Sequence, residues 1–137
     1  MEKILDTEFA IINHDKNTNS IITIWKRPTT SEDFRTVFSI ILDKMKEHKA
    51  ETFVNDICQL GLVGTEDRTW LQKEIIPQAF AAGLRKLATV ATNDVFSRFY
   101  VDQIQNGEYA SSNKLEFRYF DDLTSAQRWI GNQDIAA

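Results

Sequence analysis

Along this chain, segments whose apolar residues recur with the period of a β-strand alternate with segments whose apolar residues recur with the period of an α-helix. Residues 9–13 and 20–25 are short runs rich in β-branched and aromatic side chains, which favour extended structure. The segment between them, residues 14–19, consists mostly of turn formers. The N-terminal part is therefore predicted to form a β-hairpin, and Pro28 is expected to end its second strand.

A helical period begins after residue 30. Thr30 or Ser31 can cap free backbone N–H groups, and Glu32 and Asp33 suit the positive end of a helix dipole. Apolar residues then recur at i, i+3, i+4, i+7, i+8 and i+11, which predicts a long helix with one buried face. This predicted face consists of Phe34, Val37, Phe38, Ile41, Leu42 and Met45.

The stretch from residue 52 to residue 92 predicts a βαβ unit. Residues 52–55 and 87–91 are short, β-rich and apolar, and a glycine-containing turn and a helix connect them. Thr65 is expected to cap that helix, and Gly83 is expected to follow its last turn. Two strands joined through a helix lie parallel in one sheet.

Pro77 lies inside the predicted connecting helix. Proline lacks the backbone N–H group, and its ring clashes with the carbonyl four residues earlier, which is that of Lys73. We therefore expect a kink near Ile76 or two abutting helices.

A third helix is predicted to begin at Asn93 or Asp94, either of which can cap it. The residues that follow are strongly apolar, so the helix is expected to turn one face to the core. This face is predicted to consist of Val95, Phe96, Phe99, Tyr100 and Ile104. The polar residues 106–113 then predict a mobile loop.

An outer strand and another helix follow in the pattern. Residues 115–120 alternate as a half-exposed strand does. The last helix is predicted to begin near Thr124 or Ser125, and residues 131–137 are expected to fray. Its inner face is predicted to consist of Leu123, Ala126, Trp129 and Ile130.

The predicted order of elements is ββαβαβαβα, which indicates an α/β fold. Strands that alternate with helices form a largely parallel sheet with right-handed crossovers, and the leading hairpin makes the sheet mixed. The chain has 137 residues, the size of one ordinary domain, and contains no linker-like segment. We therefore expect a single domain over residues 1–137.

Composition narrows the classes of partner. The formal net charge is −4, so the chain is a poor candidate for nucleic-acid binding, which needs basic surface to neutralise phosphates. One cysteine allows no intramolecular disulfide and suits a reducing compartment. The sequence lacks a signal-peptide pattern and any apolar run near the ~18 residues of a membrane span. We expect a cytoplasmic protein without stable membrane insertion.

Four polar residues are candidates for a functional site at the end of a strand. Asn55 and Asp56 end the strand at residues 52–55, Cys58 follows, and Thr65 lies at the next helix start. Open α/β sheets bind ligands at the carboxyl ends of their strands. The alternative is structural: a single aspartate at such a place usually accepts N–H bonds from a turn. These residues complete no catalytic motif, and no cofactor is expected.

Cys58 needs a neighbouring base to act as a nucleophile, and the chain has two histidines, His14 and His48. His14 lies in the predicted hairpin loop and His48 at the end of the first helix. The alternative is that Cys58 is a small apolar residue in a packed turn. The spacing of the histidines places no third ligand with them, so no metal site is expected.

Large apolar residues around the proline form a second candidate site. Trp70, Ile76, Pro77 and Phe80 could line a surface for a protein partner or an apolar ligand, because exposed aromatic side chains mark such surfaces. The alternative is that Trp70 is partly buried in the core, as tryptophans generally are.

The order of elements and the strand-end residues together resemble the SpoIIAA-like proteins. This group includes the STAS domains and small proteins labelled STAS/SEC14-like, and the resemblance spans nearly the whole chain. Its motifs are Trp25…Pro28 before Ser31-Glu32-Asp33-Phe34, then Phe53-Val54-Asn55-Asp56, then Trp70…Ile76-Pro77…Ala82-Gly83 before Leu87-Ala88, and Phe120-Asp121-Asp122…Ala126…Trp129.

The resemblance also carries an expectation about regulation. Anti-sigma-factor antagonists of this group have a phosphorylatable serine after an aspartate. Here Ile57 and Cys58 stand where those serines would be, after Asp56. This departure argues against a serine phospho-switch, and the nearest hydroxyl, that of Thr65, is interpreted as a helix cap.

Three functions follow as expectations. The first is a non-enzymatic cytoplasmic regulatory or interaction module that binds a protein partner or itself as a homodimer. The second, by analogy with the SEC14 label, is a protein that binds a small apolar ligand or lipid, although a core of this size leaves little room for a large cavity. The third is an enzyme that uses Asp56 with Cys58 or His14.

Overall fold

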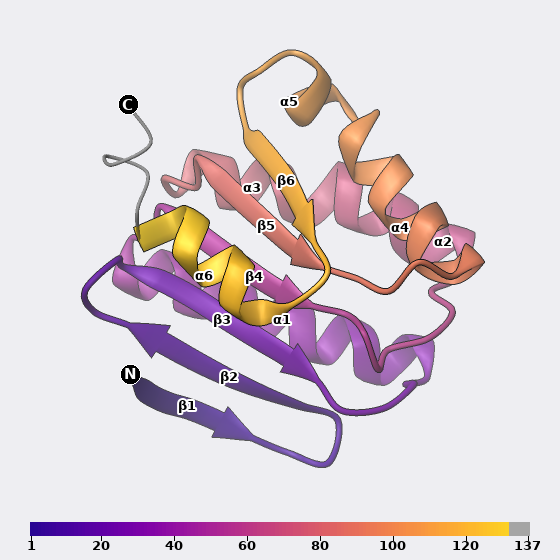
Figure 1. Ribbon diagram of the computed structural model, residues 1–137, viewed down its shortest axis with the longest axis horizontal. Helices are drawn as coiled ribbons and strands as arrows, with labels where there is room; N and C mark the ends of the chain where they lie inside the picture. Colours follow the sequence, from indigo (N-terminus) through magenta and orange to yellow (C-terminus); the bar gives the residue numbers. More distant parts are fainter. Residues whose placement is uncertain (132–137) are drawn as a thin grey trace.

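The computed structural model describes residues 1–131 and contains one six-stranded sheet with helices on both faces (Figure 1). The strands lie in the sheet in chain order. They are β1 (Glu2–Asp6), β2 (Ala10–Asp15), β3 (Ser20–Trp25), β4 (Thr52–Asp56), β5 (Lys86–Val90) and β6 (Glu116–Phe120). The helices are α1 (Ser31–His48), α2 (Thr65–Trp70), the π-helix η1 (Leu71–Ile75), α3 (Ile76–Ala81), α4 (Val95–Gln105), α5 (Glu108–Ser111) and α6 (Leu123–Gly131).

The sheet confirms the α/β prediction. The pairs β1–β2 and β2–β3 are antiparallel, and β3, β4, β5 and β6 are parallel to one another, so the sheet is mixed and mostly parallel. The predicted fraying of the chain end falls mainly on residues 132–137, which lie outside the described residues.

The strand β1 was missed by the sequence analysis. It pairs with β2 at one edge of the sheet, and its register shifts between Lys3 and Leu5. Only Ile4 and Leu5 of this strand pack against the core. A strand that buries so little has no clear alternation of apolar and polar residues, which explains why it left no signal.

All crossover helices lie on one face of the sheet. Because the parallel strands follow one another in one direction, right-handed crossovers place every connecting helix on the same side. Figure 1 shows α1 and α3 behind the sheet and α6 in front of it. The larger core lies on the face that α1, η1, α3 and α4 cover, and a smaller cluster lies beneath α6.

The helix α1 forms as predicted. The Thr30 side chain accepts the N–H of Asp33 at its start, and Lys49 ends it in the left-handed conformation. The predicted apolar face is buried in full. Its Phe34 and Phe38 rings lie 5.5 and 5.7 Å from the Trp25 ring on β3, which locks the helix to the sheet.

The expected disruption at Pro77 is confirmed as a π-helical turn between two short α-helices. The N–H of Ile76 bonds the carbonyl of Leu71, five residues earlier. This wider turn precedes the proline, which occupies the first turn of α3, where its missing N–H costs little. The helix start was predicted one residue late: Gly64 is the N-cap of α2, and Thr65 is its first residue.

The predicted core face of α4 is wrong in three positions. Val95, Phe96 and Phe99 are 55%, 44% and 51% exposed. The buried positions are Ser97, Tyr100, Val101 and Ile104. They also follow helical spacing, so the sequence carries two overlapping stripes, of which the aromatic one gives the wrong face. The buried stripe accommodates a serine because the Ser97 hydroxyl bonds Thr92 and Asp94. The predicted loop that follows contains the short helix α5.

A matched pair of glycines tests the turn after α3. Gly83 has φ +123° and Gly64 has φ −64°, and in both cases no atom lies within 4 Å of an added Cβ. Gly83→Ala should lower the free energy of unfolding by about 1–2 kcal/mol, because only backbone strain is added. Gly64→Ala should cost less than about 1 kcal/mol. Urea denaturation measures both, and equal losses would contradict the assignment.

Candidate functional site

The strand-end residues predicted as one site lie on opposite faces of the sheet. Asn55 is 1% exposed and points toward the helices α1 and α4. Asp56, the next residue, points to the other face, as side chains alternate along a strand. The two side chains therefore belong to different environments and do not converge on one ligand.

Asn55 is the centre of a buried hydrogen-bond chain. Its Oδ1 accepts from Trp25 Nε1 at 2.9 Å, and its Nδ2 donates to the Tyr100 hydroxyl at 2.9 Å. Burial raises the pKa of the Tyr100 phenol, so the hydroxyl stays protonated. The chain links β3, β4 and α4. Its geometry gives Asn55 a structural role, since both of its polar ends are occupied.

Asp56 and Cys58 form a turn. The Asp56 carboxylate accepts the N–H of Cys58 at 3.1 Å, which closes the loop after β4. Burial, together with a hydrogen bond to the Asp56 carboxylate, raises the pKa of the Cys58 thiol to about 12. At neutral pH this thiol is protonated, and the thiolate is the nucleophilic form. Thr65 makes a local contact, in which its hydroxyl accepts from Arg68.

The histidines lie at the other end of the sheet from Cys58. His14 pairs with Ile21, which in turn pairs with Phe53 near the start of β4, whereas Asp56 ends that strand. The rings of His14 and His48 stack with centroids 3.9 Å apart. Asp56, Cys58 and His14 therefore do not meet. Within residues 1–131, no three His, Cys, Asp or Glu side chains are placed to hold a metal ion.

Trp70 is covered by an ion pair that joins α1 to α2. The guanidinium of Arg35 lies 5.0 Å from the centre of the Trp70 ring, and its Nε donates to Asp67 at 2.7 Å. Asp67 is buried and also accepts from the Ser31 hydroxyl. Trp70 thus packs against the core with a charged side chain over its face.

The other three residues of that predicted surface are also engaged. Ile76 is buried, and Pro77 is partly buried in the first turn of α3. The Phe80 ring lies 4.0 Å beneath the guanidinium of Arg85 and 5.1 Å from the Tyr109 ring. The four residues do not form one continuous exposed apolar surface.

Exposed apolar side chains occur instead in the segments that follow the ends of β4 and β5. Leu62, in the loop that leads to α2, is 59% exposed, and Val95, Phe96 and Phe99 project from the first turns of α4. We call these four residues the carboxyl-end patch. Arg68 of α2 lies 5.4 Å from the Phe99 ring, which places α2 beside the patch. Sequence reasoning missed this surface because it assigned three of the residues to the core.

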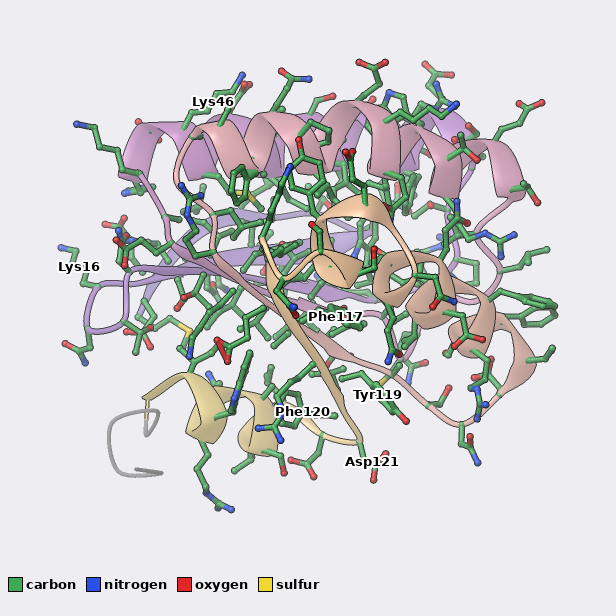
Figure 2. All side chains as sticks on the ribbon, turned by 90° about the horizontal axis from the view of Figure 1, so that it is seen from above. Lys16, Lys46, Phe117, Tyr119, Phe120 and Asp121 are labelled. Carbon is green, nitrogen blue, oxygen red and sulfur yellow. The ribbon has the colours of Figure 1, made fainter. Side chains whose placement is uncertain are left out.

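A polar groove lies beside the patch, between α4 and the ends of β5 and β6. It has a volume of about 620 Å³. Its charged and aromatic lining comes from Arg98 and Asp102 of α4 and from Tyr119 and Asp121 at the end of β6. Figure 2 shows Tyr119 on the side of β6 that faces α4, and Phe120 on the side of α6.

The apolar interior offers little space for a ligand. The cavity between the helices and the sheet, beside Phe38, Phe53 and Tyr100, has a volume of about 20 Å³. Ligand pockets are usually on the order of 300–1,000 Å³. A space of this size is a packing defect.

The structural role of Asn55 can be tested by substitution. Asn55→Leu leaves the Trp25 N–H and the Tyr100 hydroxyl without partners in the core, so the free energy of unfolding should fall by about 2–4 kcal/mol. Asp56→Asn keeps an oxygen acceptor for the N–H of Cys58 and should cost less than about 1 kcal/mol. Urea denaturation monitored by tryptophan fluorescence measures both. A neutral Asn55→Leu would argue that the hydrogen-bond chain does not stabilise the fold.

Cys58 should be unreactive in the native protein. With its pKa raised to about 12, alkylation by iodoacetamide at pH 8 should be roughly 100- to 1,000-fold slower than that of a free cysteine. The rate should keep rising with pH beyond pH 9, where a free thiol levels off. Mass spectrometry follows the reaction, and the protein unfolded in guanidinium is the control. A native rate equal to the unfolded rate would contradict the raised pKa.

Comparison with known proteins identifies no relative. No family model matches the chain, no curated protein matches it, and no solved structure matches it. Among residues 1–131, no helix combines the length and apolarity needed to cross a membrane. None of these comparisons identifies the SpoIIAA-like group.

Proposed function

We propose that the protein is a non-enzymatic interaction module that binds a protein partner, or a second copy of itself, through the carboxyl-end patch. The observation that carries this proposal is the exposure of Leu62, Val95, Phe96 and Phe99 at one end of the molecule. Clustered exposed aromatic side chains are costly in water and mark surfaces that a partner covers.

The patch is presented on a well-anchored helix. The Asp94 carboxylate caps α4 by accepting the N–H groups of Phe96 and Ser97, both at 2.9 Å. The opposite side of α4 is buried and is tied to the sheet by the bond between Tyr100 and Asn55. The backbone of this helix is already ordered before binding, so binding costs little backbone entropy, which favours recognition.

The size of the patch favours a transient complex. Standard interfaces bury on the order of 800 Å² per partner, which four half-exposed side chains do not supply alone. The neighbouring charges of Arg68 and Arg98 supply a polar rim. A regulatory module that exchanges partners fits these properties better than a permanent assembly does.

The SpoIIAA/STAS-like assignment remains part of this proposal. Its support is the sequence motifs together with a sheet whose crossover helices share one face. A cytoplasmic location is also proposed, since a single free cysteine suits a reducing compartment. The second candidate, an apolar-ligand or lipid binder, has weaker support because the interior cavity is about 20 Å³.

The proposal can be tested with a photo-crosslinking amino acid placed at Phe96. In cells of the source organism, crosslinking from position 96 should give a discrete adduct of higher mass, and position 43, an exposed aspartate on α1, should not. The mass of the adduct distinguishes a second copy from another protein. In sedimentation velocity from about 1 µM to about 1 mM, self-association would appear as a rising sedimentation coefficient.

A double variant supplies the control. Phe96→Ser/Phe99→Ser removes the two rings, so it should abolish the complex while the melting temperature falls by only a few degrees, because each ring is about half exposed. Asp43→Ser, on the exposed side of α1, should leave the complex intact. The proposal would be contradicted if the protein sediments as a monomer at every concentration and crosslinking from positions 96 and 43 is equal.

A further inference from the structure

The outer edge of β6 carries free backbone hydrogen-bonding groups. Glu116 donates its N–H to Arg85, and Phe120 accepts from the N–H of Ala91, so the even-numbered residues of β6 face β5. In a parallel ladder, successive residues face opposite sides. Phe117 and Tyr119 therefore direct their N–H and C=O groups outward.

The open stretch has a defined start. The N–H of Leu115 also points outward, where it bonds the carbonyl of Tyr109 at 3.0 Å. From Phe117 onward, the structure over residues 1–131 shows no partner for these outward groups. In Figure 2, β6 crosses the front of the molecule with no other element over it.

The opposite edge of the sheet is protected, which makes the open edge at β6 distinctive. The strand β1 has an irregular register between Lys3 and Leu5. Asp6 bonds both Lys3 and Lys26 there, and the Lys26 ammonium also bonds the carbonyl of Thr7. Irregular, charged edges resist pairing with another strand. In contrast, β6 keeps a regular register with β5 over its whole length.

Cations near the β6 edge are engaged with aromatic rings. The Arg118 guanidinium and the Lys86 ammonium lie 5.6 and 4.7 Å from the Trp129 ring. Lys114 lies 5.5 Å from the Tyr109 ring. These contacts hold the positive charges on or beside β6 against the protein.

The carboxylates of the adjoining groove are free. Asp102 and Asp121 make no side-chain hydrogen bond or ion pair with any described residue, and both line the groove with Tyr119 and Arg98. The Arg98 guanidinium contacts Asn93 at 3.5 Å. Tyr119 is 57% exposed, so its ring is available to a cation. Beside the open edge the groove therefore holds two carboxylates and an aromatic ring together with the single guanidinium of Arg98, so its formal charge is −1.

We propose that β6 binds an extended segment of a partner protein, which adds a seventh strand and places a lysine or arginine side chain in the groove. Main-chain pairing with Phe117 and Tyr119 supplies the affinity, and the groove supplies the preference for a basic side chain. The overall net charge of −4 favours the approach of such a segment.

A second copy of this chain fits the edge poorly. Two β6 strands related by a two-fold axis, and paired through Phe117 and Tyr119, would place Arg118 directly opposite its own copy. Like charges in directly opposed positions are destabilising. The surface adjoins the carboxyl-end patch but contains none of its four residues, so this inference does not depend on the function proposed above.

The probe for this proposal is a hexapeptide of alternating valine and lysine. Added to the isotopically labelled full chain, it should give saturable shifts of the Phe117 and Tyr119 amide signals and slow their hydrogen exchange. A valine–glutamate hexapeptide should not. A valine–lysine peptide whose backbone nitrogens on the edge facing β6 are methylated should not bind either, because it lacks the N–H donors for main-chain pairing.

Variants of the protein test whether the carboxylates of the groove cause the preference for a basic side chain. Asp102→Asn and Asp121→Asn should each weaken binding roughly two- to fivefold, and the matched control Asp43→Asn should not. The Phe96→Ser/Phe99→Ser variant should bind the peptide normally, which separates this inference from the proposed function.

Three results would overturn the proposal. The first is the absence of saturable shifts at β6, and the second is equal binding of the N-methylated or the glutamate peptide. The third is protection of the Phe117 and Tyr119 amides at high protein concentration without peptide, which would assign the edge to a second copy.

Discussion

The handedness of the crossovers is the constraint on which the rest of this structure depends. Since β3 to β6 follow one another in space as in sequence, each right-handed crossover returns on the same side. One face therefore carries a thick helical layer with most of the core, and the other carries α6 alone. Within residues 1–131 the strand order never reverses, so this sheet has no switch point of the kind at which open α/β sheets bind ligands. The two surfaces proposed for binding accordingly lie at the start of a helix and at a strand edge.

The buried hydrogen bonds of Asn55 hold α4, which carries three residues of the carboxyl-end patch, against the sheet. Asn55 takes a hydrogen bond from Trp25 and gives one to Tyr100, so β3, β4 and α4 are joined by side chains of fixed geometry. An apolar residue at this position would pack without specifying the rotation of α4. Tyr100 faces Asn55, and the preceding residue, Phe99, projects from the outer side of α4. The buried hydrogen bond thus helps to set the rotation of α4 about its axis.

The sequence predicted the elements well where one physical signal dominated. The helix α1 has a single apolar stripe and a Thr30 cap, and Pro77 can only interrupt a helix, so both predictions hold. Prediction failed where two signals competed or none was present. In α4 an aromatic stripe competed with a smaller one that contains Ser97, and burial is decided by the rest of the core. Because side chains alternate between the two faces of a sheet, the sequence could have predicted that Asn55 and Asp56 point to opposite faces. It could not predict which residues of other elements lie next to each of them.

Sequential strand order also bears on how the chain folds. Each strand pairs with the one before it, so every addition extends an existing edge and closes a loop no longer than one crossover. Such topologies have shorter sequence separations between contacts than sheets that pair more distant strands, and folding is faster where these separations are shorter. The sheet can therefore grow in the order in which its strands are synthesised. The apolar side chains of Ile22, Val54 and Ala88, which α6 covers in the folded protein, stay exposed to solvent until α6 has been synthesised. During that interval, the nascent sheet is the form of this protein most exposed to aggregation.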